Sequence, residues 1–278
     1  MTVPNKVHFV FGLREQTEPF HLVHYLALES CRRLLMPEAI YLHHKHLPFG
    51  VYWDLIRPHL TLVDADLVPE VLDAPHDERL VPARYRYAHH ADFVRLDALI
   101  EHGGIYADID TLFVRAFPAE LFDHPFVIGQ EYAVRDELTG ELRPSLCNAL
   151  LMAEPGADFA VAWRAEMAAA LNGTWSNHSC FLPHELSVRM PEAVHIEPSR
   201  SFYRYRPDRE DLALLLEQLD DDTDGVLSIH LWNHLWWEPW RRDYSDVHGG
   251  RLTAEQVRAG ATTYAALARR FAPELDLW

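Results

Sequence analysis

The chain has little cysteine, little positive charge and no long hydrophobic run. Its 278 residues include three cysteines, too few and too widely spaced for a disulfide framework or a cysteine-rich zinc site. No apolar stretch reaches the roughly 20 residues that a membrane-spanning helix needs, and the apolar run near the N-terminus is too short for a signal peptide. We therefore expect a cytoplasmic protein without disulfides or a transmembrane anchor.

Positive charge is scarce relative to negative charge. Lysine and arginine number 25 against 42 aspartates and glutamates, which gives a formal net charge of −17. Such a field repels nucleic acid and anionic lipid surfaces, so nucleic-acid binding is excluded as the main function. A phosphate-bearing ligand would need a metal ion or a few well-placed arginines to offset the repulsion.

Strand and helix patterns alternate along the first half of the chain. The whole sequence is 49% hydrophobic, which is enough for a large core. The alternation favours an α/β fold with a mostly parallel sheet flanked by helices, its core spanning most of residues 5–155. The predicted strands are 7–11, 39–42, 60–63, 105–114, 126–129, 146–152 and 225–231. The predicted helices are 19–35, 84–102, 158–171, 208–219 and 253–271, and residues 172–207 are expected to be irregular.

Two aspartates lie at the end of one predicted strand. From Ile105 onward, the strand period of two puts Tyr106, Asp108 and Asp110 on one face. Burying two anions side by side costs several kcal/mol unless a cation compensates, and carboxylate oxygens suit Mg²⁺ or Mn²⁺, which also bind substrate phosphates. An Asp-x-Asp triplet alone is more often a solvated strand end or turn, so its context decides.

That context resembles the sugar-binding region of glycosyltransferase family 32. The resemblance rests on an Asp-x-x-Arg element at Asp92 and Arg95, a Gly-Gly-x-Tyr element ending at Tyr106, and the Asp-x-Asp element, all within residues 90–110. The related glucosyltransferase domains of bacterial toxins share this arrangement. The resemblance implies a GT-A (Rossmann-like) fold in one domain over residues 1–278. Residues 5–155 would form the nucleotide-sugar-binding core and 156–278 the acceptor-side and C-terminal helical part.

The resemblance also implies roles for these residues. Asp108 and Asp110 would bind the metal ion, and Tyr106 and Asp108 would contact the donor. Asp92 and Arg95 would hold sugar hydroxyls and the diphosphate, with Arg95 supplying positive charge to the leaving group. From spacing alone, the favoured interpretation of Asp92 and Arg95 is an i, i+3 ion pair on a helix surface, which would be functionally silent.

Further candidate residues follow from looser matches to the family. Asn148, in the block that begins at Cys147, is a candidate sugar or acceptor contact and joins Arg95 and Asp108 as a predicted catalytic residue. His230 would complete the metal shell, although His234 competes for that role and a lone histidine is usually structural. Phe11 and Gly12, at the end of the first strand, would meet the nucleotide base.

Two other polar features are expected to be less specific. Glu131 follows the strand 126–129 and could face the acceptor, but an exposed loop carboxylate is the favoured interpretation. The histidine-rich segment 43–46 matches no motif, and we expect it at the surface.

The function predicted from these features is metal-dependent hexosyl transfer. Mn²⁺ or Mg²⁺ would hold a nucleoside diphosphate sugar, with UDP-sugar the donor that the family suggests. The acceptor would be a glycan, a lipid-linked sugar, a small molecule or a protein. The family relationship implies retention of anomeric configuration, and we expect a bacterial, cytoplasmic enzyme.

Two alternatives belong to other functional classes. A phosphatase of the haloacid dehalogenase type uses Asp-x-Asp-x-Thr, but here Thr111 follows Asp110 directly and the motif lies far from the first strand. The second alternative is a non-catalytic sugar-binding protein, in which clustered tryptophans would stack on sugar rings. Packing in the core explains these tryptophans equally well. They are Trp232, Trp236, Trp237 and Trp240.

Overall fold

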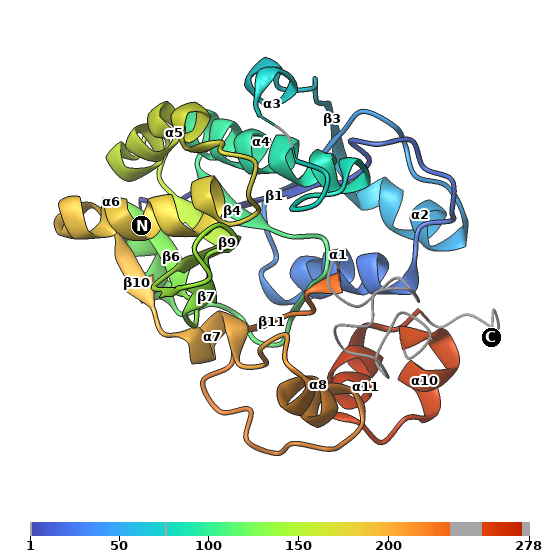
Figure 1. Ribbon diagram of the computed structural model, residues 1–278. Coiled ribbons are helices and arrows are strands. Elements are labelled where there is room, and N and C mark those ends of the chain that lie inside the picture. Colours follow the sequence, from blue (N-terminus) through green and yellow to red (C-terminus); the bar gives the residue numbers. More distant parts are fainter. Residues whose placement is uncertain (1, 76, 234–251, 274–278) are drawn as a thin grey trace.

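A seven-stranded sheet runs through the middle of the molecule (Figure 1). The computed structural model describes residues 2–75, 77–233 and 252–273. The strand order is β10-β6-β9-β4-β1-β2-β3, and neighbours are parallel except where β9 pairs with β4 and β6. The strands of this sheet are β1 (Lys6–Val10), β2 (Ala39–His44), β3 (Thr61–Asp64), β4 (Gly104–Ala107), β6 (Phe126–Gln130), β9 (Leu146–Ala153) and β10 (His195–Glu197).

Helices cover both faces of this sheet, with α4 and α5 on one side and α1 on the other (Figure 1). The predicted α/β class with a mostly parallel sheet flanked by helices is thus confirmed, whereas the division of the chain at residue 155 stays a prediction. The helices are α1 (Leu22–Leu34), α2 (Val51–Ile56), α3 (Pro69–Asp73), α4 (Arg86–His102), α5 (Asp158–Ala170), α6 (Leu182–Arg189), α7 (Ser199–Tyr203), α8 (Arg209–Leu216), α10 (Ala254–Ala259) and α11 (Thr263–Ala268).

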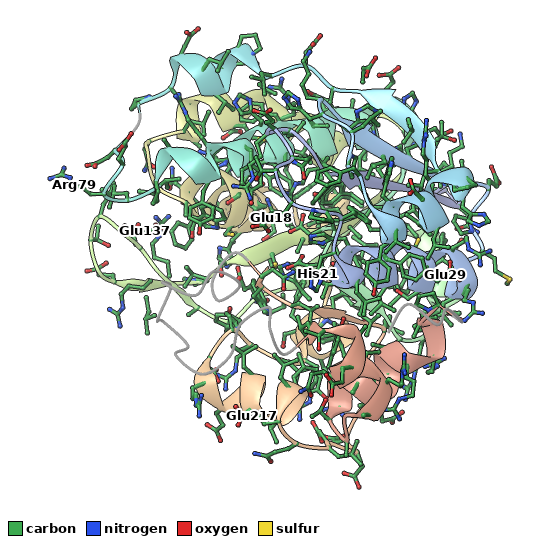
Figure 2. All side chains as sticks on the ribbon, turned by 90° about the vertical axis from the view of Figure 1, so that its right-hand side faces the viewer. Glu18, His21, Glu29, Arg79, Glu137 and Glu217 are labelled. Atoms are coloured by element: carbon green, nitrogen blue, oxygen red, sulfur yellow. The ribbon has the colours of Figure 1, made fainter. Side chains whose placement is uncertain are left out.

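Side-chain alternation in the strands builds two hydrophobic cores, one on each face. In β4, Ile105 and Ala107 face the core beneath α1, whereas Tyr106 faces the core formed by α4, α5 and α6. Figure 2 shows His21 at the start of α1, where it caps the helix, and Glu29 within it, and the C-terminal helices lie next to that helix. The period-two prediction for β4 is therefore confirmed by packing.

A pair of glycines joins α4 to β4. Gly103 has a φ of 62°, and its N–H donates to the carbonyl oxygen of Leu99 at 2.8 Å, which ends the helix. Gly104 has a φ of 109°, and a Cβ atom there would lie 2.5 Å from the carbonyl oxygen of Lys6 on β1. Only glycine suits these two positions, so the glycine pair fixes where β4 begins and thereby the position of Asp108 directly after it.

The single strand predicted over 105–114 is wrong. It divides into β4 and β5 (Thr111–Phe113), with a turn between them in which the N–H of Thr111 donates to the carbonyl oxygen of Asp108 at 2.9 Å. β5 then pairs with β11 (Ser228–His230) in a second sheet. Asp108 and Asp110 therefore lie at a turn between two sheets.

Two other expectations fail in the second half. Residues 172–207 are not irregular, since they hold a π-helix (Asn177–Phe181), α6, β10 and α7. The predicted C-terminal helix breaks at Gly260, and Thr262 then caps α11 by accepting a hydrogen bond from the backbone N–H of Ala265. A small hairpin of β7 (Val134–Arg135) and β8 (Leu142–Arg143) projects beyond β6.

The histidine-rich segment is only half at the surface. His43 and His44 are buried in β2, because this strand lies between β1 and β3, whereas Lys45 and His46 are exposed beyond its end. His43 Nε2 lies 3.1 Å from Nδ1 of buried His8 on β1. Burial and the neighbouring histidines lower the pKa of His43 to about 4 and that of His8 to about 3. This pair is therefore an uncharged part of the sheet interior.

Candidate functional site

Three ligand-type side chains converge at the β4–β5 turn. Asp108, Asp110 and His230 each offer one ligand atom, and these atoms all lie within 4.8 Å of one another. His230 Nε2 is 3.1 Å from Asp110 Oδ1 and 3.6 Å from Asp108 Oδ2. We call these three residues the triad. The sequence-predicted metal ligands are thus brought together.

Antiparallel pairing explains how His230 reaches the aspartates. β11 pairs with β5 so that His230 lies opposite Thr111, the residue after Asp110. The chain then turns at Trp232, whose φ of 54° is unusual for a residue other than glycine, and the backbone N–H of Asn233 donates to Asp110 Oδ2 at 2.9 Å. The competing His234 lies outside the described residues.

The triad holds its charges at an electrostatic cost. Burial raises the pKa of Asp108, and the nearby Arg95 and His230 offset only part of this effect. Burial disfavours the charged form of His230, but Asp110 and Asp108 outweigh it and raise the pKa of the imidazole. Nδ1 of His230 and both side-chain atoms of Asn233 have no hydrogen-bond partner among the described residues. The triad is therefore polar, crowded and incompletely satisfied.

Asp92 and Arg95 form a buried ion pair. Arg95 Nη2 lies 2.9 Å from Asp92 Oδ1 and 3.4 Å from Asp108 Oδ1, and the two residues are 7% and 4% exposed. The surface-pair alternative is wrong, because α4 packs this face against the sheet. Burial opposes ionisation of Asp92, yet Arg95 and His178 hold its pKa below the usual range. Arg95 thus connects Asp92 to the triad.

Tyr106 and Asn148 complete the surroundings of Arg95. The Tyr106 hydroxyl donates to Asp108 Oδ1 at 2.6 Å, and its ring lies 4.5 Å from the Arg95 guanidinium carbon. Arg95 Nη1 donates to the Asn148 carbonyl oxygen at 2.6 Å, and Asn148 Nδ2 donates to Asp92 Oδ1 at 2.7 Å. Because β9 is antiparallel to β4, its first residues lie at the same sheet edge as Asp108.

Phe11 and Gly12 lie at that edge too, at the end of β1. The N–H of Phe11 donates to the carbonyl oxygen of His43, and the carbonyl of Gly12 accepts from the N–H of His46 at 2.8 Å. The ring of His24 lies 4.9 Å from that of Phe11, and its Nδ1 is 3.4 Å from the carbonyl oxygen of Ile109. Phe11 thus contacts the turn between the aspartates through His24.

Glu131 is buried, contrary to the exposed-loop interpretation. It is 6% exposed, directly after β6, whose C-terminal end reaches the same edge as the start of β9. Burial raises the pKa of Glu131 to about 7, although the Ser145 hydroxyl and the charge of His230 lower it in part. Its Oε2 has no hydrogen-bond partner among the residues described. An ionisable carboxyl therefore borders the triad.

His178 belongs to this site although sequence reasoning missed it. It lies in the π-helix, is 0% exposed, and its Nε2 is 2.8 Å from Asp92 Oδ2. It follows Asp92 by 86 residues and sits in no recognised motif, so no sequence signal pairs the two. The nearest hint is the abundance of polar and aromatic residues around it.

The tryptophan cluster is only partly described. Trp232 is 5% exposed, its Nε1 donates to the Tyr205 carbonyl oxygen at 3.0 Å, and its ring lies 4.2 Å from that of His230. Trp232 is therefore a core residue that supports the triad, whereas Trp236, Trp237 and Trp240 lie outside the described residues.

Comparison with known proteins supports the family resemblance. Residues 50–132 match the family described as "Glycosyltransferase sugar-binding region containing DXD motif". This segment contains Asp92, Arg95, Tyr106 and both aspartates of the triad. The resemblance predicted from residues 90–110 is therefore confirmed.

One curated relative extends the similarity beyond this segment. "Glucan organizing enzyme 1" of Cryptococcus neoformans var. grubii is 34% identical over 245 residues, which cover 84% of this chain and 64% of the relative. The chain thus spans less than two thirds of that protein. Because the relative is fungal, the expectation of a bacterial, cytoplasmic protein is wrong. The composition and motifs on which that expectation rested do not determine the source organism or the compartment.

Two solved glycosyltransferase structures are distantly similar to this chain. The PaToxG glycosyltransferase is 11% identical, covering 96% of this chain and 87% of that one, with a TM-score of 0.46. The galactosyltransferase LgtC, solved with donor and acceptor sugar analogues, is 12% identical over 98% of both chains, with a TM-score of 0.49. Likenesses this distant add nothing to the functional argument. None of the described helices combines the length and hydrophobicity of a membrane span.

Proposed function

Because the chain contains a segment that matches the DXD glycosyltransferase family, we propose that it is a metal-dependent hexosyltransferase that uses a nucleoside diphosphate sugar. The observation that carries this proposal is the convergence of the triad within 4.8 Å. Arg95, which contacts Asp108 at 3.4 Å, adds a buried cation beside it. A donor diphosphate needs such positive charge, since the whole chain has a net charge of −17.

The residues present fit a divalent ion. Two carboxylates and one imidazole are an oxygen-rich ligand set of the type that suits Mn²⁺ or Mg²⁺. The raised pKa of Asp108 shows that desolvation of this half-buried carboxylate outweighs the compensation from Arg95 and His230. When bound, the ion would neutralise charge on the diphosphate leaving group. We assign Asp108, Asp110 and His230 as its protein ligands.

Arg95, Asp92 and Asn148 would bind the transferred sugar and support its departure. The Arg95 guanidinium is fixed by Asp92, the Asn148 carbonyl and the Tyr106 ring, so it needs no reorganisation to stabilise developing negative charge. Asp92 and Asn148 offer carboxylate and amide groups to sugar hydroxyls. Phe11 and Gly12, at the end of β1, would meet the base.

The reaction we favour is same-face substitution with retention of configuration. Among the described residues, we assign none as a covalent nucleophile. The acceptor hydroxyl would attack on the face from which the nucleoside diphosphate departs, a course that the family resemblance supports. Trapping of a glycosyl-enzyme intermediate would contradict it.

Donor and acceptor follow from the family and the relative. UDP-hexose is the donor that the family favours. The name of the fungal relative, glucan organizing enzyme, favours a glycan acceptor over a lipid-linked sugar, a small molecule or a protein. A glucan oligosaccharide is therefore the first acceptor to test.

A turnover screen tests this function. Purified protein is incubated with UDP-, GDP- and dTDP-hexoses with Mn²⁺ or with a chelator, and release of the nucleoside diphosphate is measured with and without glucan oligosaccharides. We expect one donor to turn over only with metal, and Asp110→Asn to be inactive with every donor. Silence of the folded wild-type protein across the panel would contradict the proposal and favour a non-catalytic sugar-binding protein.

A further inference from the structure

A buried histidine outside the family segment contacts a residue of the proposed donor site. His178 Nε2 lies 2.8 Å from Asp92 Oδ2, and the histidine is completely buried. The family match covers residues 50–132, so it includes Asp92 but not His178. The contact therefore joins the matched segment to a part of the chain that the family model does not describe.

The carboxylate of Asp92 has three partners from three elements. Oδ1 accepts from Asn148 Nδ2 on β9 at 2.7 Å and lies 2.9 Å from Arg95 Nη2 on α4, while Oδ2 faces His178 in the π-helix. A carboxylate has about four lone-pair sites, so roughly one stays available for a ligand hydroxyl. Since Arg95 and Asn148 both hold Oδ1, His178 is the group that fixes Oδ2 and thereby the rotation of the carboxylate.

The position of His178 is set by its own surroundings. Its carbonyl oxygen accepts from buried Trp163 Nε1 at 2.9 Å, and its ring centroid lies 4.7 Å from that of His89 on α4. Asn177 Nδ2 donates to the Ala170 carbonyl at the end of α5, which anchors the start of the π-helix. Single-turn π-helices often occur at functional sites, and this one directs an imidazole into the space between α4 and α5.

The hydrogen-bond pattern selects one tautomer of His178. Nδ1 is buried and has no partner among the described residues, whereas Nε2 faces an ionised carboxylate. Only a ring with its proton on Nε2 can donate to Asp92. The imidazole thus acts as a fixed hydrogen-bond donor.

From this geometry we propose that His178 is a positioning residue that orients Asp92 for binding of the donor sugar. The inference rests on the proposed function, because it assumes that Asp92 contacts a sugar hydroxyl. His178 does not touch the substrate. It acts through Asp92, in the way that partners of metal-binding side chains orient those ligands.

The test compares substitutions that differ in their donor group. His178→Gln places an amide N–H near the position of Nε2, His178→Asn is too short to reach Asp92, and His178→Phe keeps the aromatic volume without a donor. We expect the Asn and Phe variants to raise the KM for the donor about tenfold or more, by analogy with other orienting partners. The Gln variant should recover most of this loss.

Two controls separate positioning from packing. His90→Gln changes a buried histidine on α4 whose Nδ1 accepts from the Val68 backbone N–H and does not contact Asp92, so its donor KM should be unchanged. Mn²⁺ affinity, measured by calorimetry, should also be unchanged in every folded His178 variant, because the triad does not include Asp92. A general distortion of the site would alter metal and donor binding together.

The outcomes are distinguishable. If folded His178→Asn binds the donor like the wild type, or if Gln and Asn impair it equally, the orienting role is wrong. The Gln and Asn pair decides this even if the Phe variant does not fold. If the wild-type protein itself binds no nucleotide sugar, the proposed function fails first and the inference fails with it.

Discussion

Two buried carboxylate clusters lie at one edge of the sheet, and they differ in how completely their charges are compensated. Around Asp92, one anion is matched by Arg95, and three partners from three elements hold both oxygens. In the triad, two carboxylates share one imidazole, and His230 Nδ1 and the side-chain amide of neighbouring Asn233 have no partner among the described residues. The pKa shifts agree, since that of Asp92 is lowered whereas that of Asp108 is raised.

This difference separates a part of the proposed donor site whose charges are balanced within the protein from a part whose charges are not. Because Asp92 is paired with Arg95 in a buried position, removing a member of this cluster should lower the stability of the fold as well as impair donor binding. The triad has two carboxylates and one imidazole, so under the proposed function a cation would balance it, and removing a carboxylate should impair metal binding far more than folding. Three of the four predictions that follow test this contrast, and the other concerns Glu131, which borders the triad.

The largest expected effect is on turnover. Asp110→Asn removes one charge from the triad at constant volume, and the asparagine oxygen can still accept from the Asn233 N–H. We expect metal-dependent release of nucleoside diphosphate to fall about a thousandfold, a size typical for loss of a key electrostatic group. Steady-state kinetics across Mn²⁺ concentrations measures this, and wild-type turnover in the variant would remove the triad from the mechanism.

The free energy of unfolding should depend more on the Asp92 cluster than on the triad. Asp92→Asn leaves Arg95 buried without its nearest counter-ion, so the free energy of unfolding should fall by about 3 kcal/mol. Asp110→Asn, examined with metal chelated, should change it by less than about 1 kcal/mol, because Asp108 still faces His230 and the repulsion between the two carboxylates is removed. Denaturant titration followed by tryptophan fluorescence measures both, and equal losses would invalidate the contrast.

Glu131 should make stability depend on pH. Its pKa rises from the usual 4.5 to about 7 in the folded protein, so the folded state binds the proton more tightly. The stability that this tighter proton binding contributes is therefore fully present below about pH 4.5. It is lost as the pH rises through about 7, and the loss is ~3 kcal/mol at most. Unfolding measured from pH 4 to 8 should show Glu131→Gln gaining stability relative to the wild type over this window. A constant difference would mean that Glu131 is hydrated and unperturbed.

The smallest expected effect is stabilisation by metal. At a free Mn²⁺ concentration ten times the dissociation constant, binding to the folded state alone should stabilise the wild type by about 1.4 kcal/mol. Asp110→Asn should show almost no gain, while Asp92→Asn should keep most of it. Thermal unfolding with Mn²⁺ or chelator measures this, and equal gains in all three proteins would place the ion elsewhere.

Local pattern predicted most strands of the sheet and several residues that the structure brings together at the candidate site, whose roles stay predictions. Period-two alternation located β4 and its two faces, and Gly103 and Gly104 correctly marked the end of α4. The break between β4 and β5 was not predictable in this way, because alternation continues through Asp108 and Asp110 even though the chain turns there. Its cause is non-local: β5 leaves the main sheet to pair with β11, which follows more than 100 residues later.

The remaining errors also concern long-range contacts. Spacing could not show that the Asp92–Arg95 pair is buried, since the same i, i+3 spacing occurs on helix surfaces. Glu131 looked exposed because it follows a strand end, yet β9 and the π-helix enclose it. His178 lies in a π-helix, which has no reliable sequence pattern, so its contact with Asp92 appears only in three dimensions.

The most direct test of the account is the thermodynamic coupling between metal and nucleotide. Calorimetry would measure UDP and GDP binding to the wild type and to Asp110→Asn, each with Mn²⁺ and with chelator. The account predicts that one nucleotide binds the wild type at least tenfold more tightly with Mn²⁺, that the nucleotide tightens Mn²⁺ binding by the same factor, and that Asp110→Asn loses this coupling. Nucleotide binding that is equally tight without metal, or coupling that survives in Asp110→Asn, would contradict it.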